Sequence, residues 1–337
     1  MSSQQLKMAV RGTADEAPAD SAKLAKEGAF VRPTSAVRSC IGDDAYPAEP
    51  GRYHLTVAFN CPWCHRVVLA RSLLGLEQSI SMDVLFPTRT SEKDAKGRDG
   101  LWTFRPEGME VPNGQFLTFP ECTADTVFGG VNTVVEIYDQ FDVPQKSVPL
   151  LVDKKTKTLV NNESAEILRM FSLHAAALGA ERPIDLYPKA LAADIDAVNE
   201  WVYHDINNGS YKAGFTTNQK HYEEAYASYF AALKRVDDLL ATSKFLVGDT
   251  LTEADVRLFP TLFRHDPVYY SRFKLSHSFL TAYTHVWRWL HDLYEIPGVK
   301  DSSGASYMQH CKQGYFGRSG STTVPVGPPG YPECYWS

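Results

Sequence analysis

The 337-residue chain lacks the features that define several classes of protein. Its 6 cysteines are too few and too dispersed for the disulfide framework of a small secreted protein. No stretch reaches about 18 uninterrupted apolar residues, the length of a membrane-spanning helix, and residues 1–26 contain no apolar segment typical of a secretory signal. The sequence therefore predicts a cytoplasmic protein with no membrane partner, while targeting to an organelle by the N-terminal arm stays open.

Positive charge is also scarce. Lys and Arg number 34 against 40 Asp and Glu, which gives a net charge of −6, and no basic run is longer than Lys154-Lys155. A nucleic acid or an anionic membrane requires a basic surface, so neither is expected as a partner. The histidines show no metal-ligand spacing and only one cysteine pair exists, so no metal site is predicted.

The chain does contain enough apolar sequence for a core. Hydrophobic residues make up 44% and charged residues 22% of it, and its length suits about two domains. Residues 1–50 form a polar arm rich in Ala, Pro and Ser, and the next part follows the thioredoxin order β-α-β, insertion, α-β-β-α. Strands are expected at residues 53–59, 80–86, 148–152 and 158–160, helices from the cysteine pair to about 76, at 131–141 and at 162–178, and the insertion at about 87–125.

The second part of the chain is predicted to be helical. Thr252 and Asp255 have the spacing of a capping box, which begins one helix. Apolar residues recur at helical spacing in residues 191–204, 222–240 and 279–294. The resulting organisation is an arm over 1–50, a thioredoxin-like domain over 51–182, an all-helical domain over 189–300, and a Gly/Ser/Pro-rich tail over 301–337.

The motif Cys61-Pro62-Trp63-Cys64-His65-Arg66 lies where the first strand turns into the first helix. The free N–H groups and the dipole at a helix N-terminus favour thiolate over thiol, so Cys61 is a candidate nucleophile. His65 either supports that thiolate or is a surface histidine. Half of a zinc site or two inert buried cysteines are the alternatives for the pair, but zinc would need a second pair at similar spacing.

Several motifs in order along the chain resemble those of the xi class of glutathione transferases, the omega-like glutathionyl-hydroquinone reductases. Besides the cysteine motif they are Val148-Pro149-Leu150-Leu151-Val152-Asp153, Asn161-Asn162-Glu163-Ser164-Ala165-Glu166-Ile167-Leu168-Arg169-Met170, Tyr211-Lys212-Ala213-Gly214-Phe215 and Arg264-His265-Asp266-Pro267-Val268-Tyr269. The resemblance implies a thioredoxin-like domain followed by an all-α domain, a homodimer, and reduction of glutathionyl-hydroquinones by glutathione. Glutathione and quinol-type small molecules are the implied partners, and no metal is involved.

The resemblance also implies which residues bind glutathione. Val148 before a cis Pro149 would pair its backbone with the glutathione cysteine, as in β-augmentation; the alternative is an ordinary edge-strand proline. Glu163 and Ser164 would hold a carboxylate and the α-amino group at a helix N-terminus; the alternative is a plain helix start capped by Asn162. Trp102 in the insertion would contact the glycine end, or serve only as a packing anchor.

Three tyrosines are the implied walls of a quinol pocket: Tyr211, which the sequence places in a loop, Tyr269 and Tyr315. A phenol can stack on a quinol and donate a proton, although each tyrosine taken alone is more often a core residue. In the implied reaction, Cys61 takes glutathione from the quinol as a mixed disulfide, and a second glutathione releases it.

The chain departs from the family pattern at three places. Cys64 stands where the family has Ala, Pro144-Gln145-Lys146 stands where it has a Gly-Arg pair, and Gly314-Tyr315-Phe316 replaces a His-Tyr-Tyr run. Cys64 as a resolving thiol would make a dithiol, glutaredoxin-like oxidoreductase acting on protein or small mixed disulfides. A non-catalytic module that binds glutathione or another ligand is the third possibility.

Overall fold

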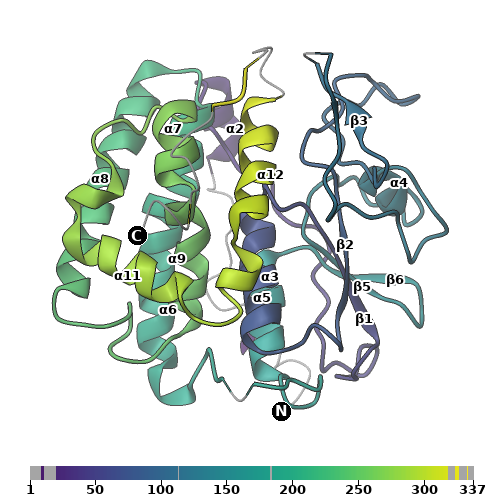
Figure 1. The fold of residues 1–337 in the computed structure, drawn as a ribbon, viewed down its shortest axis with the longest axis horizontal. Helices are drawn as coiled ribbons and strands as arrows, with labels where there is room; N and C mark the ends of the chain where they lie inside the picture. Colours follow the sequence, from purple (N-terminus) through teal and green to yellow (C-terminus); the bar gives the residue numbers. More distant parts are fainter. Residues whose placement is uncertain are drawn as a thin grey trace. The chain divides into compact units, whose positions relative to one another are not determined.

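The computed structural model describes residues 9–10, 20–112, 114–182, 184–317, 323–325 and 332. The chain divides into two compact units, which are described separately below (Figure 1). Unit 1 comprises Met1–Val10, Ser35–Pro183 and Lys300–Ser337, and unit 2 comprises Arg11–Thr34 and Ile184–Val299. The residues predicted as one arm are therefore shared between the units.

Unit 1 is built on a four-stranded sheet with the order β2-β1-β5-β6. Strand β1 runs parallel to β2 and antiparallel to β5, and β5 is antiparallel to β6. This is the predicted thioredoxin topology. All residues of β1 and β5 are buried, as expected for central strands covered on both faces. The strands span Tyr53–Val57 (β1), Ser81–Val84 (β2), Leu150–Asp153 (β5) and Thr158–Asn161 (β6).

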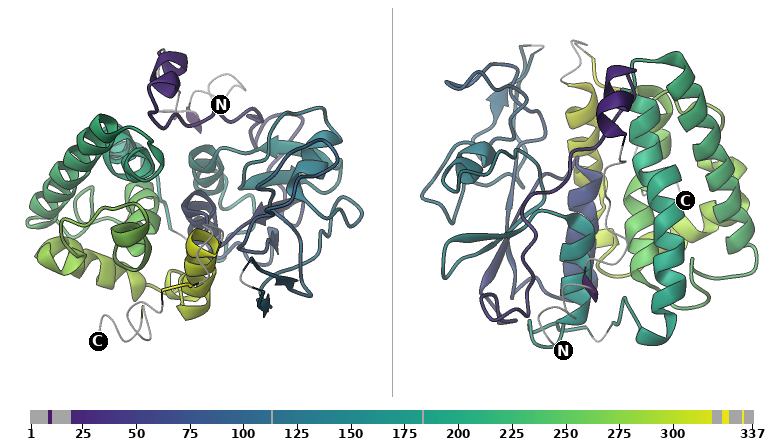
Figure 2. Two further views of the ribbon diagram at one scale, coloured as in Figure 1. Left: turned by 90° about the horizontal axis from the view of Figure 1, so that it is seen from above. Right: turned by 180° about the vertical axis from the view of Figure 1, so that it is seen from behind.

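Helices cover both faces of this sheet. Helix α3 (Pro62–Leu73) follows β1 and helix α5 (Ser164–Leu173) follows β6; both lie on one face, while α4 (Val134–Asp139) lies on the other (Figures 1 and 2). The insertion between β2 and α4 contains a small ladder of β3 (Met109–Glu110) and β4 (Phe116–Leu117). It has a small core of its own, formed by Phe86, Val111, Phe119 and Cys122.

The last described helix of unit 1, α12 (Ala305–Phe316), corrects the prediction of a tail over 301–337. Its Gly and Ser content suggested irregular chain, but Tyr307, Met308, Cys311 and Phe316 are buried. Burial of these side chains outweighs the weak helix propensity of the segment. A short 3₁₀ turn, Lys300–Ser302, precedes the helix.

The part of the arm that belongs to unit 1 is fastened to the sheet. Along the outer edge of β6, Ser39 N–H donates to Val160 O (2.8 Å) and Asn162 N–H donates to Val37 O (3.0 Å). These bonds satisfy backbone groups of an edge strand that would otherwise remain unpaired.

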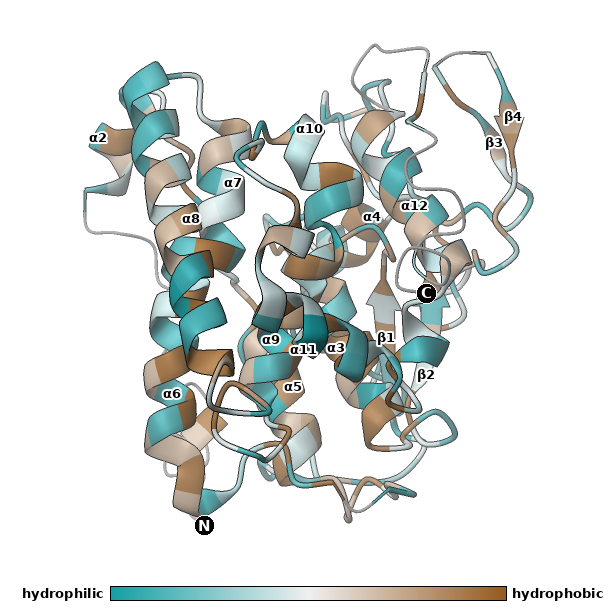
Figure 3. Ribbon diagram, turned by 60° about the vertical axis from the view of Figure 1, so that its left-hand side comes forward, coloured by the Kyte–Doolittle hydropathy of each residue, from teal (hydrophilic) through white to brown (hydrophobic). Residues whose placement is uncertain are grey.

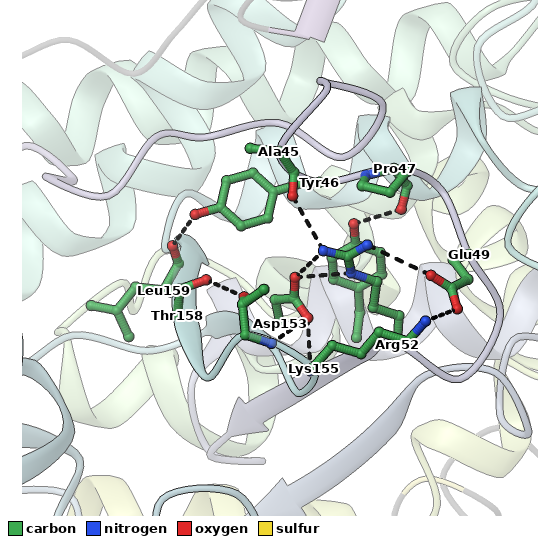
Figure 4. Close-up of polar contacts among 11 residues, drawn as sticks. Ala45, Tyr46, Pro47, Glu49, Arg52, Asp153, Lys155, Thr158 and Leu159 are labelled. Carbon is green, nitrogen blue, oxygen red and sulfur yellow. Dashed lines mark hydrogen bonds and ion pairs between the residues drawn. The ribbon is translucent and has the colours of Figure 1, made fainter.

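A polar cluster fixes the end of the arm, as Figure 4 shows. The Arg52 guanidinium donates from Nε to Asp153 Oδ2 (2.9 Å) and from a terminal nitrogen to Ala45 O (3.2 Å). Tyr46 donates its hydroxyl to Leu159 O (3.3 Å). The arm residues are thereby linked to both β5 and β6.

Unit 2 is helical, as predicted. Thr252 and Asp255 form the expected capping box at the start of α9. Along α8, hydrophobic and hydrophilic stretches alternate (Figure 3), and its apolar residues, including Tyr229, Leu233 and Val236, are buried. The α-helices are α2 (Ser21–Lys26), α6 (Ala192–Trp201), α7 (Asn208–Phe215), α8 (Gln219–Leu240), α9 (Glu253–Phe263), α10 (Tyr270–Arg272) and α11 (Thr284–Tyr294).

Two π-helical turns interrupt these helices, Val202–Asn207 between α6 and α7 and His265–Tyr269 between α9 and α10. Such turns are rare and occur frequently at functional sites. Short 3₁₀ turns lie at Lys189–Leu191 and Leu280–Ala282. No helix in the described part of the chain is long and apolar enough to cross a membrane.

Candidate functional site

Cys61 occupies the N-cap of α3, in the position that the sequence predicts. Its backbone is extended (φ −81°, ψ 120°), and Pro62 takes the first helical position, where no N–H is required. The side chain is half-buried, and its thiol donates to the carbonyl oxygen of Val148 across 3.7 Å. The first turn of α3 therefore lies beside a sulfur that remains partly accessible.

The Val148–Pro149 peptide bond is cis, as expected. Among the described residues, none accepts a hydrogen bond from the Val148 backbone N–H. The segment thus brings one backbone donor and one carbonyl next to Cys61. An extended peptide could pair with these two groups in the manner of an added strand.

Two residues that the sequence analysis did not assign to the site hold this segment. The Tyr138 hydroxyl donates to Ser147 O (2.9 Å), and Asn162 Nδ2 donates to Ser147 Oγ and to the Tyr138 hydroxyl, both at 3.2 Å. Burial raises the pKa of Tyr138 to about 12, so the hydroxyl keeps its proton. In the sequence, the place of Asn162 in the Asn-Asn-Glu-Ser motif was the feature that could have assigned it to the site.

The N-cap of α5 is Glu163, not Asn162 as the alternative interpretation had it. Glu163 Oε1 accepts from Ala165 N–H (3.2 Å), whereas Asn162 Oδ1 accepts from the arm at Val37 N–H (3.1 Å). The helix begins one residue later because the Asn162 side chain is used by tertiary contacts. Ser164 is almost completely buried, with its hydroxyl 3.5 Å from an Arg66 nitrogen.

The arm also reaches Glu163. Ser35 Oγ donates to Glu163 Oε2 over 2.9 Å, with Asn162 O farther away at 3.3 Å. A hydroxyl has a single proton to donate, so the shorter contact decides its direction. One carboxylate oxygen of Glu163 thus accepts the capping hydrogen bond from Ala165 N–H, and the other accepts from the Ser35 hydroxyl. A carboxylate offers about four lone-pair sites, which leaves capacity for an ammonium group.

Cys64 has surroundings very different from those of Cys61. Both cysteines are free thiols, but Cys64 is fully buried and its sulfur accepts from Ala58 N–H at 3.4 Å. The sulfur therefore packs against the end of β1. Only two residues, Pro62 and Trp63, separate the two cysteines along the sequence, yet of the two only Cys61 is accessible to a solute.

The alternative of a surface histidine at His65 is wrong. The ring is fully buried, its Nε2 lies 2.9 Å from Ser303 Oγ, and it stacks on Tyr307 with 4.2 Å between ring centroids. The residue is part of the packing between α3 and the C-terminal segment of unit 1. Support of the Cys61 thiolate by His65 stays a prediction.

Helix α12 also packs against the loop that leads to Cys61. The Cys311 thiol donates to Phe59 O (3.7 Å). A Cβ atom at Gly314 would come 2.0 Å from Asn60 Nδ2, so any larger residue would force the Asn60 side chain to move. Gly314 is therefore matched to the packing of Asn60.

Trp102 lies at the point where the insertion meets α4. Its carbonyl accepts from Val134 N–H (3.1 Å), and its half-buried ring lies 5.1 Å from the guanidinium carbon of Arg89. Arg89 was not identified from the sequence. It adds a cation next to the predicted glutathione-contacting ring, within cation–π range. In the segment that lacks the family arginine, Gln145 Oε1 accepts from Ser147 Oγ (3.2 Å).

The three predicted tyrosines do not share one environment. Tyr211 and Tyr269 lie in unit 2 with ring centroids 6.4 Å apart; Tyr211 is half-buried, whereas Tyr269 is fully buried and stacks on Phe273 at 4.5 Å. Tyr315 lies on α12 of unit 1. Tyr211 belongs to helix α7 rather than to a loop, because packing within unit 2 overrides the low helix propensity of Gly209.

Comparisons with known proteins agree with this geometry. The family model for the glutathione S-transferase N-terminal domain matches residues 60–172, and that for the C-terminal domain matches residues 219–292. Glutathionyl-hydroquinone reductase YqjG of Escherichia coli is 38% identical over 312 residues, covering 89% of this chain and 88% of that protein. Glutathionyl-hydroquinone reductase PcpF of Sphingobium chlorophenolicum is 36% identical, covering 89% and 90%.

Solved structures point the same way. The glutathione-bound structure of YqjG superimposes with a TM-score of 0.76 at 36% identity, covering 87% of this chain and 92% of that one. The xi glutathione S-transferase of Phanerochaete chrysosporium gives a TM-score of 0.76 at 36% identity, with 89% and 98% covered. The chain belongs to the xi class of glutathione transferases, the family of the glutathionyl-hydroquinone reductases.

Proposed function

We propose that this protein reduces glutathionyl-hydroquinones to hydroquinones with glutathione as the reductant. The observation that carries the proposal is the position of Cys61, a half-buried thiol at a helix N-terminus, 3.7 Å from the carbonyl that precedes cis-Pro149. Relatives that carry the name of this activity support it.

The reaction takes two thiol–sulfur exchanges. The Cys61 thiolate attacks the sulfur of the glutathionyl group, the carbon–sulfur bond breaks with its electron pair on the ring carbon, and that carbon takes a proton. Hydroquinone leaves, and Cys61 holds glutathione as a mixed disulfide. The thiolate of a second glutathione attacks this disulfide, which releases glutathione disulfide and regenerates the Cys61 thiolate.

Glutathione is bound in this proposal by the residues around Cys61. The Val148 backbone pairs with its cysteine beside Pro149, Glu163 accepts from its α-amino group, and the Ser164 end of α5 takes the adjacent carboxylate. Trp102 contacts the glycine end. Arg89, 5.1 Å from the Trp102 ring, offers a cation for the glycine carboxylate in place of the absent family arginine.

The quinol proton comes from a tyrosine hydroxyl in this proposal. Tyr211 is the first candidate because its side chain is half-exposed. Tyr269 is buried beneath it and supports its ring, and Tyr315 is the candidate contributed by α12. The active form is proposed to be a homodimer, to be checked by light scattering of the purified protein.

Steady-state assays on a glutathionyl-hydroquinone test the proposal. Cys61→Ser should have no measurable turnover, because serine forms no mixed disulfide; full activity in that variant would refute the mechanism. Cys64→Ala should retain wild-type turnover within about twofold, since the fully buried Cys64 sulfur cannot reach a solute without local opening.

The dithiol oxidoreductase remains the second candidate, because Cys64 is a free thiol. If the protein is a dithiol oxidoreductase, Cys64→Ala should lose activity on a glutathionylated peptide, and the peptide should be a better substrate than the glutathionyl-hydroquinone. A non-catalytic binding module would instead show slow reaction of Cys61 with iodoacetamide and no turnover of either substrate.

A further inference from the structure

A serine, a histidine and an aspartate lie next to one another on one face of the sheet of unit 1. His54 of β1 and Ser81 of β2 are direct neighbours in the parallel ladder, and Asp83 follows Ser81 by two residues. Since side chains alternate along a strand, all three project to the same face. His54 is the second residue of β1, whereas Cys61 comes after the last one. None of the three belongs to the proposed glutathione site.

Asp83 is the carboxylate of this group. Thr126 donates its backbone N–H to Asp83 Oδ2 (2.8 Å), and the Thr126 hydroxyl lies within 3.1 Å of both carboxylate oxygens. Burial raises the pKa of Asp83, but the contacts with His54 and Thr126 lower it by more, so the carboxyl group is ionised at neutral pH. An ionised carboxylate only accepts hydrogen bonds.

The carboxylate fixes the tautomer of the neutral histidine. His54 Nε2 lies 3.1 Å from Asp83 Oδ2, so Nε2 is the nitrogen that carries the ring proton. The angle of this contact departs from that of a good hydrogen bond; contacts of this kind commonly tighten when a substrate binds. The other ring nitrogen, Nδ1, is then an acceptor. It lies 2.9 Å from Ser81 Oγ, which donates its proton to it.

Ser81 therefore has the partners of an activated nucleophile. A base within hydrogen-bond reach, oriented in turn by a carboxylate, is the arrangement that activates a serine hydroxyl. In the usual triad the carboxylate contacts Nδ1 and the serine contacts Nε2. The two nitrogens of His54 exchange these parts, but the order of serine, base and carboxylate is the same.

Lys154 adds a cation to the nucleophile. Its ammonium donates to Ser81 Oγ (2.9 Å), the one hydrogen bond that it makes within the described residues. A positive charge at this position stabilises an alkoxide and, with two further N–H donors, the oxyanion of an attacked carbonyl. Ser81 and Lys154 are partly exposed on or beside the edge strand β2, whereas His54 is 1% exposed. A solute can thus reach the hydroxyl while the base stays shielded from water.

We propose that Ser81 is the nucleophile of a second site, which hydrolyses small carboxylic esters. Ser81 Oγ attacks the ester carbonyl carbon while its proton passes to His54 Nδ1. The ester C–O bond breaks, and the alcohol leaves with that proton. Water then attacks the acyl-serine with His54 again as the base, which releases the acid and restores the hydroxyl. Lys154 stabilises the oxyanion in both steps. This activity is independent of the thiol exchange at Cys61.

Labelling of the full chain with a fluorophosphonate tests the nucleophile without any substitution. The probe forms a bond from phosphorus to an activated serine oxygen and releases fluoride. We expect peptide mass spectrometry to find the label on Ser81, and the rate of labelling to fall at least about tenfold in His54→Gln, because the general base is lost. Absence of the label from Ser81 in the wild-type protein would overturn the proposal.

Hydrolysis of p-nitrophenyl acetate tests turnover. The assay uses Cys61→Ser as background, because a reactive thiol also attacks this ester. Adding Ser81→Ala should lower the rate at least about tenfold, whereas adding Ser79→Ala, which removes a partly exposed hydroxyl two residues earlier, should leave it unchanged. Equal ester hydrolysis with and without the Ser81 hydroxyl would refute the site.

The two activities can be told apart in one further variant. Ser81→Ala in the otherwise wild-type chain should reduce a glutathionyl-hydroquinone at the wild-type rate, which also shows that the variant is folded. A loss of that reduction together with the ester hydrolysis would mean that Ser81 acts through the structure of the sheet, and the proposal would be wrong.

Discussion

Asn162 shows how much a single buried amide can determine in this site. Its Nδ2 bonds Tyr138 and Ser147, and its Oδ1 accepts from Val37. One side chain thereby links the arm, α4 and the segment that precedes cis-Pro149. Buried polar groups of this kind are costly to leave unpaired, which makes Asn162 a positioning residue for the proposed glutathione contact.

We expect Asn162→Ala to lower the free energy of unfolding by about 1–3 kcal/mol, because Ser147, Tyr138 and Val37 each lose a partner. The KM for glutathione should rise several-fold as Val148 becomes less well held, while Cys61 remains reactive. Denaturant titration and steady-state kinetics measure the two effects. Tyr138→Phe removes part of the same network, so the double variant should show coupling; additive effects would contradict the network.

At the scale of elements, the N-terminal arm does more than cover an edge of the sheet. Its residues pair with β6, and Ser35 reaches the N-cap of α5 at Glu163. The proposed α-amino contact of glutathione is therefore oriented by a segment that lies outside the thioredoxin topology.

Ser35→Ala should raise the KM for glutathione a few-fold with little change in kcat, because Glu163 loses the hydrogen bond that orients one oxygen. Ser39→Ala is the matched control, since the hydrogen bonds of Ser39 to β6 are made by its backbone. Equal effects of the two substitutions would mean that the arm acts only through general stability. Kinetics at several glutathione concentrations separate KM from kcat.

The Arg52–Asp153 pair should make the attachment of the arm dependent on pH. Burial raises the pKa of Asp153, but hydrogen bonds from Arg52, Thr156 and Lys155 lower it by more. A carboxyl group whose pKa is depressed in the folded state stabilises the fold above its unfolded pKa, near 3.9, and this contribution is lost as the pH falls through the folded value.

Arg52→Gln should therefore cost about 1–3 kcal/mol of unfolding free energy at pH 7 and markedly less at pH 3. Urea denaturation at both pH values measures the difference. Lys234→Gln, which removes an exposed ion pair with Asp238, should leave the free energy of unfolding nearly unchanged at both pH values. A cost for Arg52→Gln that is the same at both pH values would contradict the role of Asp153.

At the scale of the whole molecule, the units do not correspond to successive halves of the chain. Unit 2 includes Arg11–Thr34, and the chain returns to unit 1 at Lys300. Helix α12 therefore completes the thioredoxin-like unit, where Tyr307 of the helix and Ser303 just before it cover the ring of His65. The predicted domains, 51–182 and 189–300, were assigned in the order of the sequence. No local pattern in the sequence indicates that a later segment packs back onto the first domain.

A fragment of residues 35–182 should accordingly be less stable than the same fragment joined to residues 300–317 through a flexible linker. Without α12, the rings of Phe59 and His65 lose their stacking partner Tyr307. We expect a midpoint of thermal unfolding at least about 3 °C lower, which corresponds to about 1 kcal/mol in a unit of this size. Identical melting curves would show that α12 is dispensable.

The sequence by itself determined the local features. Strand and helix periodicity, the turn at Cys61-Pro62 and the capping box at Thr252 depend on neighbouring residues, and these predictions were confirmed. The motifs also identified the family, and relatives 36% and 38% identical over 89% of the chain confirm it.

Tertiary structure decided what depends on distant residues. The burial of Cys64 and His65, the shift of the α5 cap from Asn162 to Glu163, and the helix around Gly314 arise from contacts between segments far apart in the chain. The free energy of those contacts exceeds the local propensities on which the sequence predictions relied. For this reason the sequence could name Cys61, but only the packing separated it from Cys64.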